Sequence, residues 1–95
     1  MNKEEARQVV LEELKKYEKI PYEQLRDFVL QGKINAYQVI RGDTTYDIEI
    51  LFHWDSRHEK RDIRVAGLIN VSGDLSVYRP LSEDFILRPD GSFIE

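Results

Sequence analysis

The sequence predicts an α+β domain with two N-terminal helices packed on one face of a four-stranded antiparallel β-meander, plus a short C-terminal hairpin. Apolar residues recur with the 3.6-residue period of a helix in the N-terminal third, and they alternate as in a strand after Lys33. The dipeptide Gly42-Asp43 is typical of a two-residue turn between two such strands. Periodicity and turn chemistry therefore agree on the same order of elements.

The first helix is expected over residues 2–19. Asn2 can accept a backbone N–H at the helix start, and Glu5 follows three residues later, as in a capping box. Leu11 lies off the apolar face of this helix. That face consists of Ala6, Val9, Val10, Leu14 and Tyr17.

The second helix is shorter and begins after a break at Ile20-Pro21, because proline is tolerated only in the first turn of a helix. Gly32 can end this helix in a left-handed conformation. The apolar stripe of the second helix consists of Tyr22, Leu25, Phe28 and Val29. We therefore expect two helices that meet at a corner.

Two long strands are expected over residues 44–54 and 62–71. In both segments every second residue faces one side, which is typical of an antiparallel sheet with one buried face. Gly67 stands among the inward-facing residues of the second segment. The others are Tyr46, Ile48, Ile50, Phe52, Trp54, Ile63, Val65, Ile69 and Val71.

The two-residue turn also determines which side chains meet across the strands. It places Tyr37 opposite Ile48, so an apolar residue faces an apolar residue. The same matching of apolar residues favours Phe52 opposite Val65 in the next pair of strands. The sheet therefore has one apolar face for the helices to cover.

The C-terminal quarter is expected to complete the meander. Residues 72–74 form a turn, and a fourth strand follows over residues 76–81, where Pro80 indicates an edge position. A second turn is expected at residues 82–84. The sequence of residues 88–92 is typical of a tight turn and predicts a small terminal hairpin.

Composition and charge narrow the functional classes. The 95 residues, 41% hydrophobic and 34% charged, predict a single domain over residues 1–95. The chain has no cysteine, which excludes a disulfide framework and cysteine-ligated metals. A net charge of −4 argues against a phosphate-binding surface, so nucleic acid is not an expected partner. Neither a signal peptide nor a membrane span is expected, and the predicted location is the cytoplasm.

One group of residues, His53, Asp55 and His58, has the composition of a metal site. His53 and Asp55 share a strand face, and His58 in the following loop can fold back toward them. Two imidazoles and a carboxylate suit Zn²⁺ or Fe²⁺. An exposed histidine beside a polar loop explains the same pattern, so we predict no metal and no cofactor.

Catalytic signals are weak throughout the chain. Carboxylates are paired at Asp47 and Glu49 and again at Glu83 and Asp84, but acid–base catalysis requires a desolvating pocket. Asp47 and Glu49 point away from the expected core, which indicates solvated charges. The sequence carries no dinucleotide-binding, P-loop or nucleophile-elbow motif. We therefore predict no catalytic residue and favour a protein that is not an enzyme.

Basic residues do not form a nucleic-acid site either. Arg57, Lys60 and Arg61 are interleaved with acidic residues, which is typical of a solvated hairpin tip. The second helix is nearly balanced in charge, whereas a DNA-recognition helix is basic and polar.

The outer face of the sheet carries four apolar residues, Ile40, Leu51, Ala66 and Leu68. In the favoured register Leu51 lies opposite Ala66, with Leu68 nearby. An apolar patch of this kind can seat a protein partner or a second copy of the chain.

These observations favour a small non-catalytic binding or protein-interaction module that uses the outer sheet face or an exposed edge strand. The alternative is a small-molecule-binding or enzymatic domain with a pocket between helices and sheet near Trp54. The identity of the partner or ligand does not follow from the sequence.

Overall fold

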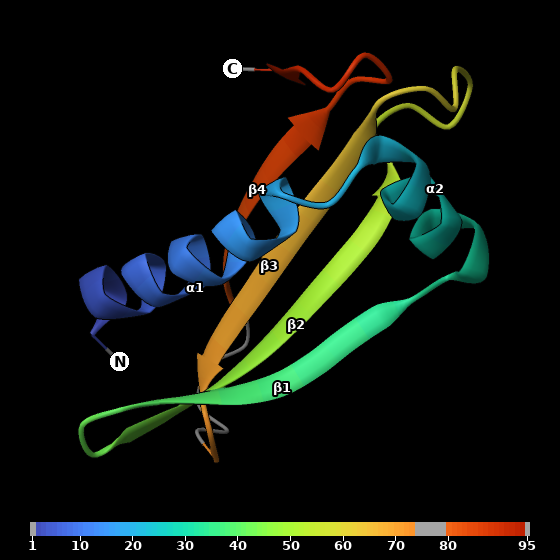
Figure 1. The fold of residues 1–95 in the computed structure, drawn as a ribbon. Helices are drawn as coiled ribbons and strands as arrows, with labels where there is room; N and C mark the ends of the chain where they lie inside the picture. The colour runs from blue at the N-terminus through green and yellow to red at the C-terminus, as the bar shows by residue number, and fades with distance from the viewer. Residues whose placement is uncertain (1, 74–79, 95) are drawn as a thin grey trace.

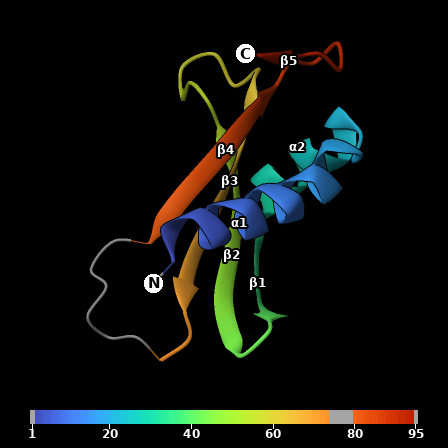
Figure 2. The same cartoon turned by 90° about the vertical axis from the view of Figure 1, so that its left-hand side faces the viewer.

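A computed structural model describes residues 2–73 and 80–94 and confirms the predicted α+β class (Figure 1). Two helices pack on one face of a five-stranded antiparallel sheet whose strands follow in chain order, β1-β2-β3-β4-β5 (Figure 2). The elements are α1 (Lys3–Glu18), α2 (Tyr22–Gln31), β1 (Ile34–Arg41), β2 (Thr44–Trp54), β3 (Ile63–Val71), β4 (Leu81–Leu87) and β5 (Phe93–Ile94).

The start of α1 confirms the predicted cap in part. The side chain of Asn2 accepts a hydrogen bond from the backbone N–H of Glu5 at 3.1 Å. The carboxylate of Glu5 does not complete a capping box, because it accepts a hydrogen bond from the Tyr46 hydroxyl instead. The N-terminal turn of α1 is therefore attached to the sheet. α1 packs mainly on β3 and β4.

The second helix ends as predicted. Gly32 adopts a left-handed conformation with φ of 65°, and the N–H of Lys33 bonds the carbonyl of Phe28 at 3.0 Å. α2 covers parts of β2 and β3, where the rings of Phe28 and Phe52 meet edge to face at 5.0 Å. In the described part of the chain, neither helix combines the length and the apolar run that crossing a membrane requires.

The register of the long strands is the predicted one. Tyr37 pairs with Ile48 across β1 and β2, and Phe52 pairs with Val65 across β2 and β3. Gly42 takes a positive φ of 58° in the hairpin between β1 and β2, a conformation that glycine adopts without steric cost. The turn therefore directs one apolar face of the sheet toward the helices.

The predicted turn at residues 82–84 is wrong, because these residues belong to β4. Residues 76–79 of the predicted fourth strand lie outside the described residues, and the described strand begins at Leu81. Acidic residues suggested a turn, but each has a basic partner from a distant segment: Glu83 pairs with Arg7 of α1, and Asp84 pairs with Arg64 of β3. The predicted terminal hairpin is confirmed, and its first strand is the end of β4.

An apolar core lies between the helices and the sheet. Its buried members are Ala6, Val9, Val10, Leu14, Leu25, Tyr46, Ile48, Ile50, Phe52, Ile63, Val65, Ile69 and Leu87. Gly67 is the point of closest approach between α1 and β3. A Cβ atom at Gly67 would lie 2.7 Å from Cγ2 of Val10 and 3.3 Å from Cγ of Leu14.

We expect Gly67→Ala to lower the free energy of unfolding by about 1–3 kcal/mol, because the added methyl group would push α1 away from the sheet. Urea titration followed by circular dichroism measures this change. Ala66→Ser is the matched control, since Ala66 is on the other face of β3 and its substitution should change stability by only about 0.5 kcal/mol. Equal stabilities of the two variants would contradict this account of Gly67.

Candidate functional site

Among the described residues, the sheet has two edges at which a strand lacks a neighbour on its outer side. β1 borders the sheet on one side along its whole length. On the other side β5 pairs only with Ile86 and Leu87, so the first part of β4 has no neighbouring strand among the described residues. Open edges of this kind are potential sites for pairing with another chain.

Ladder alternation shows which backbone groups of β4 point outward. The N–H of Ser72 donates to the carbonyl of Thr45, and the N–H of Asp55 donates to the carbonyl of Asp62, both at 2.8 Å. Because hydrogen-bonded pairs alternate along an antiparallel ladder, the even-numbered residues of β3 bond to β2. Odd-numbered residues of β3 therefore bond to β4. In the β3–β4 register odd-numbered residues pair with odd-numbered residues, as Val65 does with Phe85, so the odd-numbered residues of β4 bond to β3. The even-numbered residues Ser82 and Asp84 therefore direct their N–H and C=O groups to the open edge.

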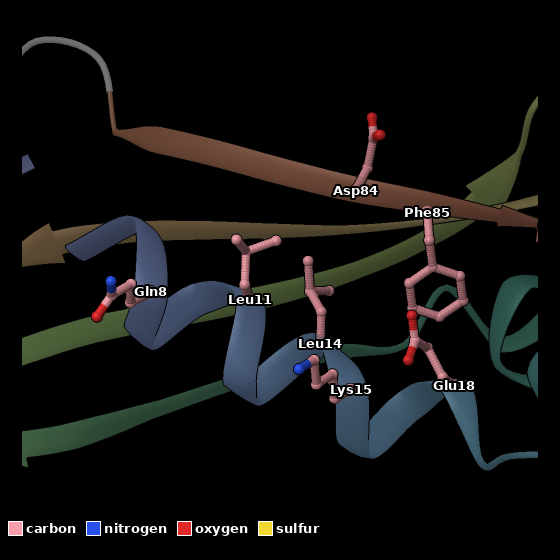
Figure 3. Close-up of a pocket in the computed structure, with 7 residues that line it drawn as sticks. All are labelled: Gln8, Leu11, Leu14, Lys15, Glu18, Asp84 and Phe85. Atoms are coloured by element: carbon pink, nitrogen blue, oxygen red, sulfur yellow. The ribbon is translucent and has the colours of Figure 1, made fainter. Parts of the chain in front are cut away.

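A groove lies between α1 and this part of β4. It has a volume of about 280 Å³ and is lined by Gln8, Leu11, Leu14, Lys15, Glu18, Asp84 and Phe85. Figure 3 shows Leu11 and Leu14 pointing from α1 toward the strand, while Phe85 points from β4 toward α1. The Asp84 side chain points away from the helix. The groove thus has an apolar floor directly beside the outward-pointing backbone of β4.

The groove results from a second stripe on α1, next to the stripe that enters the core. Gln8, Leu11, Lys15 and Glu18 are separated by three or four residues and share one face of the helix. Leu11 is 37% exposed on this face. The sequence analysis missed the groove, although Leu11 was the available signal because it lies off the core face. The helix-facing position of Phe85 depends on β4, whose extent was not predicted.

Ion pairs hold both sides of β4. On the helix side Arg7 contacts Glu83 at 2.8 Å. On the outer side the guanidinium of Arg64 bonds the carboxylates of Asp55 and Asp84, and these bonds raise the pKa of Arg64 above its ordinary value. Side chains on both faces of β4 therefore link this strand to α1 and to β3.

The three residues with the composition of a metal site, His53, Asp55 and His58, do not come together. Asp55 is engaged by Arg64, with an N–O distance of 2.6 Å, and both His53 and His58 are exposed. Within residues 2–73 and 80–94, no three histidine, aspartate or glutamate side chains are grouped as metal binding requires. Of the other carboxylates considered, Asp47 accepts a hydrogen bond from Gln38 at 2.9 Å and, like Glu49, is exposed.

The apolar residues of the outer face occupy two places. Leu51 lies opposite Ala66, and Leu68 lies opposite Glu49; all three apolar residues are half-buried. Ile40 lies farther away, near the end of β1, and is 66% exposed. Ile34, which the sequence analysis did not single out, is opposite Leu51 and 59% exposed. The most exposed apolar residues of this face are thus on the edge strand β1.

Tyrosine and carboxylate side chains meet between α1 and the first two strands. Glu13 is only 4% exposed and pairs with Lys16 at 3.0 Å. Burial, together with hydrogen bonds to Glu13 and Tyr17, raises the pKa of Tyr37. Asn35 donates to the Tyr17 hydroxyl at 3.0 Å. These groups satisfy one another, so they attach α1 to the sheet and do not present a free acid or base.

The remaining candidates also have structural partners. Trp54 is half-buried and packs against the core, opposite Ile63 of β3. In the basic loop, the carbonyl of Arg61 accepts a hydrogen bond from the Tyr22 hydroxyl of α2, while Arg57 and Lys60 are exposed.

Comparison with protein-family models, with curated proteins and with solved structures finds no match to this chain.

The Tyr46–Glu5 contact predicts a loss of stability in alkaline solution. Burial, and next the hydrogen bond to Glu5, raise the pKa of Tyr46 from 10.0 to about 12. A group whose pKa is higher in the folded state stabilises the fold below its unfolded pKa, and this contribution is lost as the pH rises from 10 toward 12. Urea titrations at several pH values between 8 and 12 should show this fall.

Tyr46→Phe should flatten the alkaline fall and lower stability at pH 8 by about 1 kcal/mol, because Glu5 then lacks its hydrogen-bond donor. Lysine deprotonation affects both proteins alike, so the difference between their pH profiles isolates Tyr46. Parallel profiles would show that this hydroxyl does not couple to folding.

Proposed function

We propose that the domain is a non-catalytic protein-interaction module that binds an extended segment of a partner protein as an added strand on β4, beneath α1. The observation that carries the proposal is that the groove lined by Leu11, Leu14 and Phe85 lies beside the outward backbone groups of Ser82 and Asp84. Strand addition uses main-chain hydrogen bonds for affinity and pockets for alternate side chains for specificity.

The backbone contribution comes from two residues. Ser82 and Asp84 each offer one N–H and one C=O, so an added strand can form about four main-chain hydrogen bonds, each contributing roughly 0.5–1.5 kcal/mol net. This number is small, and main-chain bonds alone would recognise any extended peptide. The groove must therefore supply the remaining affinity and the selectivity.

The groove favours an apolar side chain in the bound segment. In an added strand every second side chain faces α1, and the one nearest Phe85 enters between Leu11 and Phe85. Burial of a leucine-sized side chain there contributes roughly 2 kcal/mol. Lys15 and Glu18 place opposite charges at the rim, so we expect no strong preference for the net charge of the segment.

Asp84→Pro should weaken peptide binding at least tenfold, because proline removes an N–H that points to the open edge and bears no bond to β3. Asp84→Ala is the matched control, since it also lacks the carboxylate that binds Arg64 but retains the N–H. Peptides are selected against the whole 95-residue chain from a displayed random library, and affinities are measured by fluorescence anisotropy.

Two further variants locate the bound peptide. Leu11→Glu should weaken binding by changing the groove, whereas Leu51→Glu on the outer sheet face should leave the affinity unchanged. Thermal melting verifies that each variant is folded. Failure to select any peptide, equal affinities for Asp84→Pro and Asp84→Ala, or loss of binding in Leu51→Glu alone would refute the β4 site; the last result would favour the outer face.

A further inference from the structure

We propose that β1, at the opposite edge of the sheet, pairs with β1 of a second copy of the chain, antiparallel and about a two-fold axis at Tyr37. The two sheets would then form one continuous sheet across the dimer. This proposal is independent of the peptide site, because it uses a different strand and different backbone groups.

The outward backbone groups of β1 follow from the ladder. Even-numbered residues of β3 bond to odd-numbered residues of β2, so even-numbered residues of β2 bond to β1. In the β1–β2 register each even-numbered residue of β2 pairs with an odd-numbered residue of β1, as Ile48 does with Tyr37. Odd-numbered residues of β1 therefore face β2, and the outward groups belong to Ile34, Ala36, Gln38 and Ile40.

The edge of β1 lacks the devices that usually prevent pairing. Natural edge strands are protected by proline, bulges, inward charges or a covering segment. Residues 34–41 contain neither proline nor glycine, and all of them pair in unbroken register with β2. No strand among the described residues adjoins the outer side of β1, which borders the sheet in Figure 1. Charges stand only near its ends, at Lys33 and Arg41.

Self-complementarity selects one register. With the axis at Tyr37, Ile34 pairs with Ile40 of the second copy, and Ala36 pairs with Gln38 of the second copy. The two isoleucines are 59% and 66% exposed in the single chain, and this register covers both of them in each copy. About eight backbone hydrogen bonds form, two for each of four hydrogen-bonded pairs.

The neighbouring registers are worse. An axis at Ala36 places Ile40 opposite Gly32, which has a left-handed conformation and is outside the strand. An axis at Gln38 places Ile34 opposite Gly42, which lies in the hairpin turn. Each alternative therefore leaves one isoleucine in each copy without a strand residue opposite.

The helix-side face tolerates the same register. Lys33 lies opposite Arg41 of the second copy, but the guanidinium of Arg41 is already paired with Glu12 at 2.9 Å. Lys33 itself is held over the ring of Phe28, with its ammonium 4.4 Å from the ring centre. The negative charge of Glu12 therefore reduces the repulsion between Arg41 and the Lys33 of the second copy.

The proposed interface is small, so we expect a weak dimer. Eight strand residues extend over roughly 26 Å and bury less than the 1,200–2,000 Å² of a stable interface. We expect a dissociation constant on the order of 10–100 μM, in the range of weak and transient complexes. The dimer should thus be absent at low micromolar concentration and predominate at high concentration.

Sedimentation velocity of the full chain from about 1 μM to 1 mM tests this proposal. We expect a concentration-dependent shift from monomer to dimer that Gln38→Pro abolishes. Gln38→Ala is the matched control: both variants lose the side-chain bonds to Asp47 and Ser72, but only proline removes the outward N–H. Ile40→Lys should weaken the dimer at least tenfold, whereas Leu68→Lys, on the outer face of β3, should not.

A cysteine placed on the axis tests the register. Because the chain has no cysteine, Tyr37→Cys introduces a single thiol, and the two thiols of the dimer face each other in a pair with Cα atoms about 4.5 Å apart. Mild oxidation at high concentration should cross-link this variant and leave Glu49→Cys on the outer face monomeric. Circular dichroism verifies the fold of Tyr37→Cys.

Three results would overturn the proposal. The first is a chain that stays monomeric at 1 mM, a concentration roughly 10- to 100-fold above the expected dissociation constant. The second is a dimer that Gln38→Pro leaves intact but Leu68→Lys or Asp84→Pro dissociates, because the interface would then be the outer face or β4. The third is equal cross-linking of Tyr37→Cys and Glu49→Cys. Peptide binding is measured at low micromolar concentration, so failure at either edge is distinguishable from failure at the other.

Discussion

The hairpin between β1 and β2 is the constraint on which the other features of this protein depend. Gly42 and Asp43 leave no freedom in the pairing of the strands they join, so the register of β1 with β2 is fixed by the turn. Because side chains alternate along a strand, this register places every side chain on either the helix side or the outer side of the sheet. The same alternation of residues along each strand determines which backbone N–H and C=O groups point outward at the two edges of the sheet.

The position of α1 across the sheet makes those two edges different. Gly67 lets the helix approach β3 closely, and Arg7 attaches it to Glu83 of β4. On the other side, Glu5 and Glu13 reach back to tyrosines of β1 and β2. α1 therefore lines the groove beside β4. β1 forms the opposite border of the sheet, and no further strand lies outside it among the described residues (Figure 1).

The two proposals assign a different occupant to each edge of the sheet. The open part of β4 is short, but it has an apolar groove beside it, so a side chain of a foreign peptide can be selected there. The edge of β1 is longer and has exposed isoleucines at both ends on the outer face. In the proposed antiparallel dimer, Ile34 of one copy lies opposite Ile40 of the other, so the edge of β1 is complementary to itself. A peptide of unrelated sequence lacks this complementarity.

The sequence by itself determined both helices, the hairpin, the register of three strands and the buried face, because periodicity, caps and turn residues act over short distances. It did not determine β4. Glu83 and Asp84 pair with Gly67 and Ala66 of β3, and their carboxylates form ion pairs with Arg7 and Arg64 from distant segments. The groove depends on β4 and on the packing of α1 against it. Asp55, a candidate metal ligand by composition, is ion-paired with Arg64. Tertiary structure decided these features, since each depends on a contact between residues far apart in the chain.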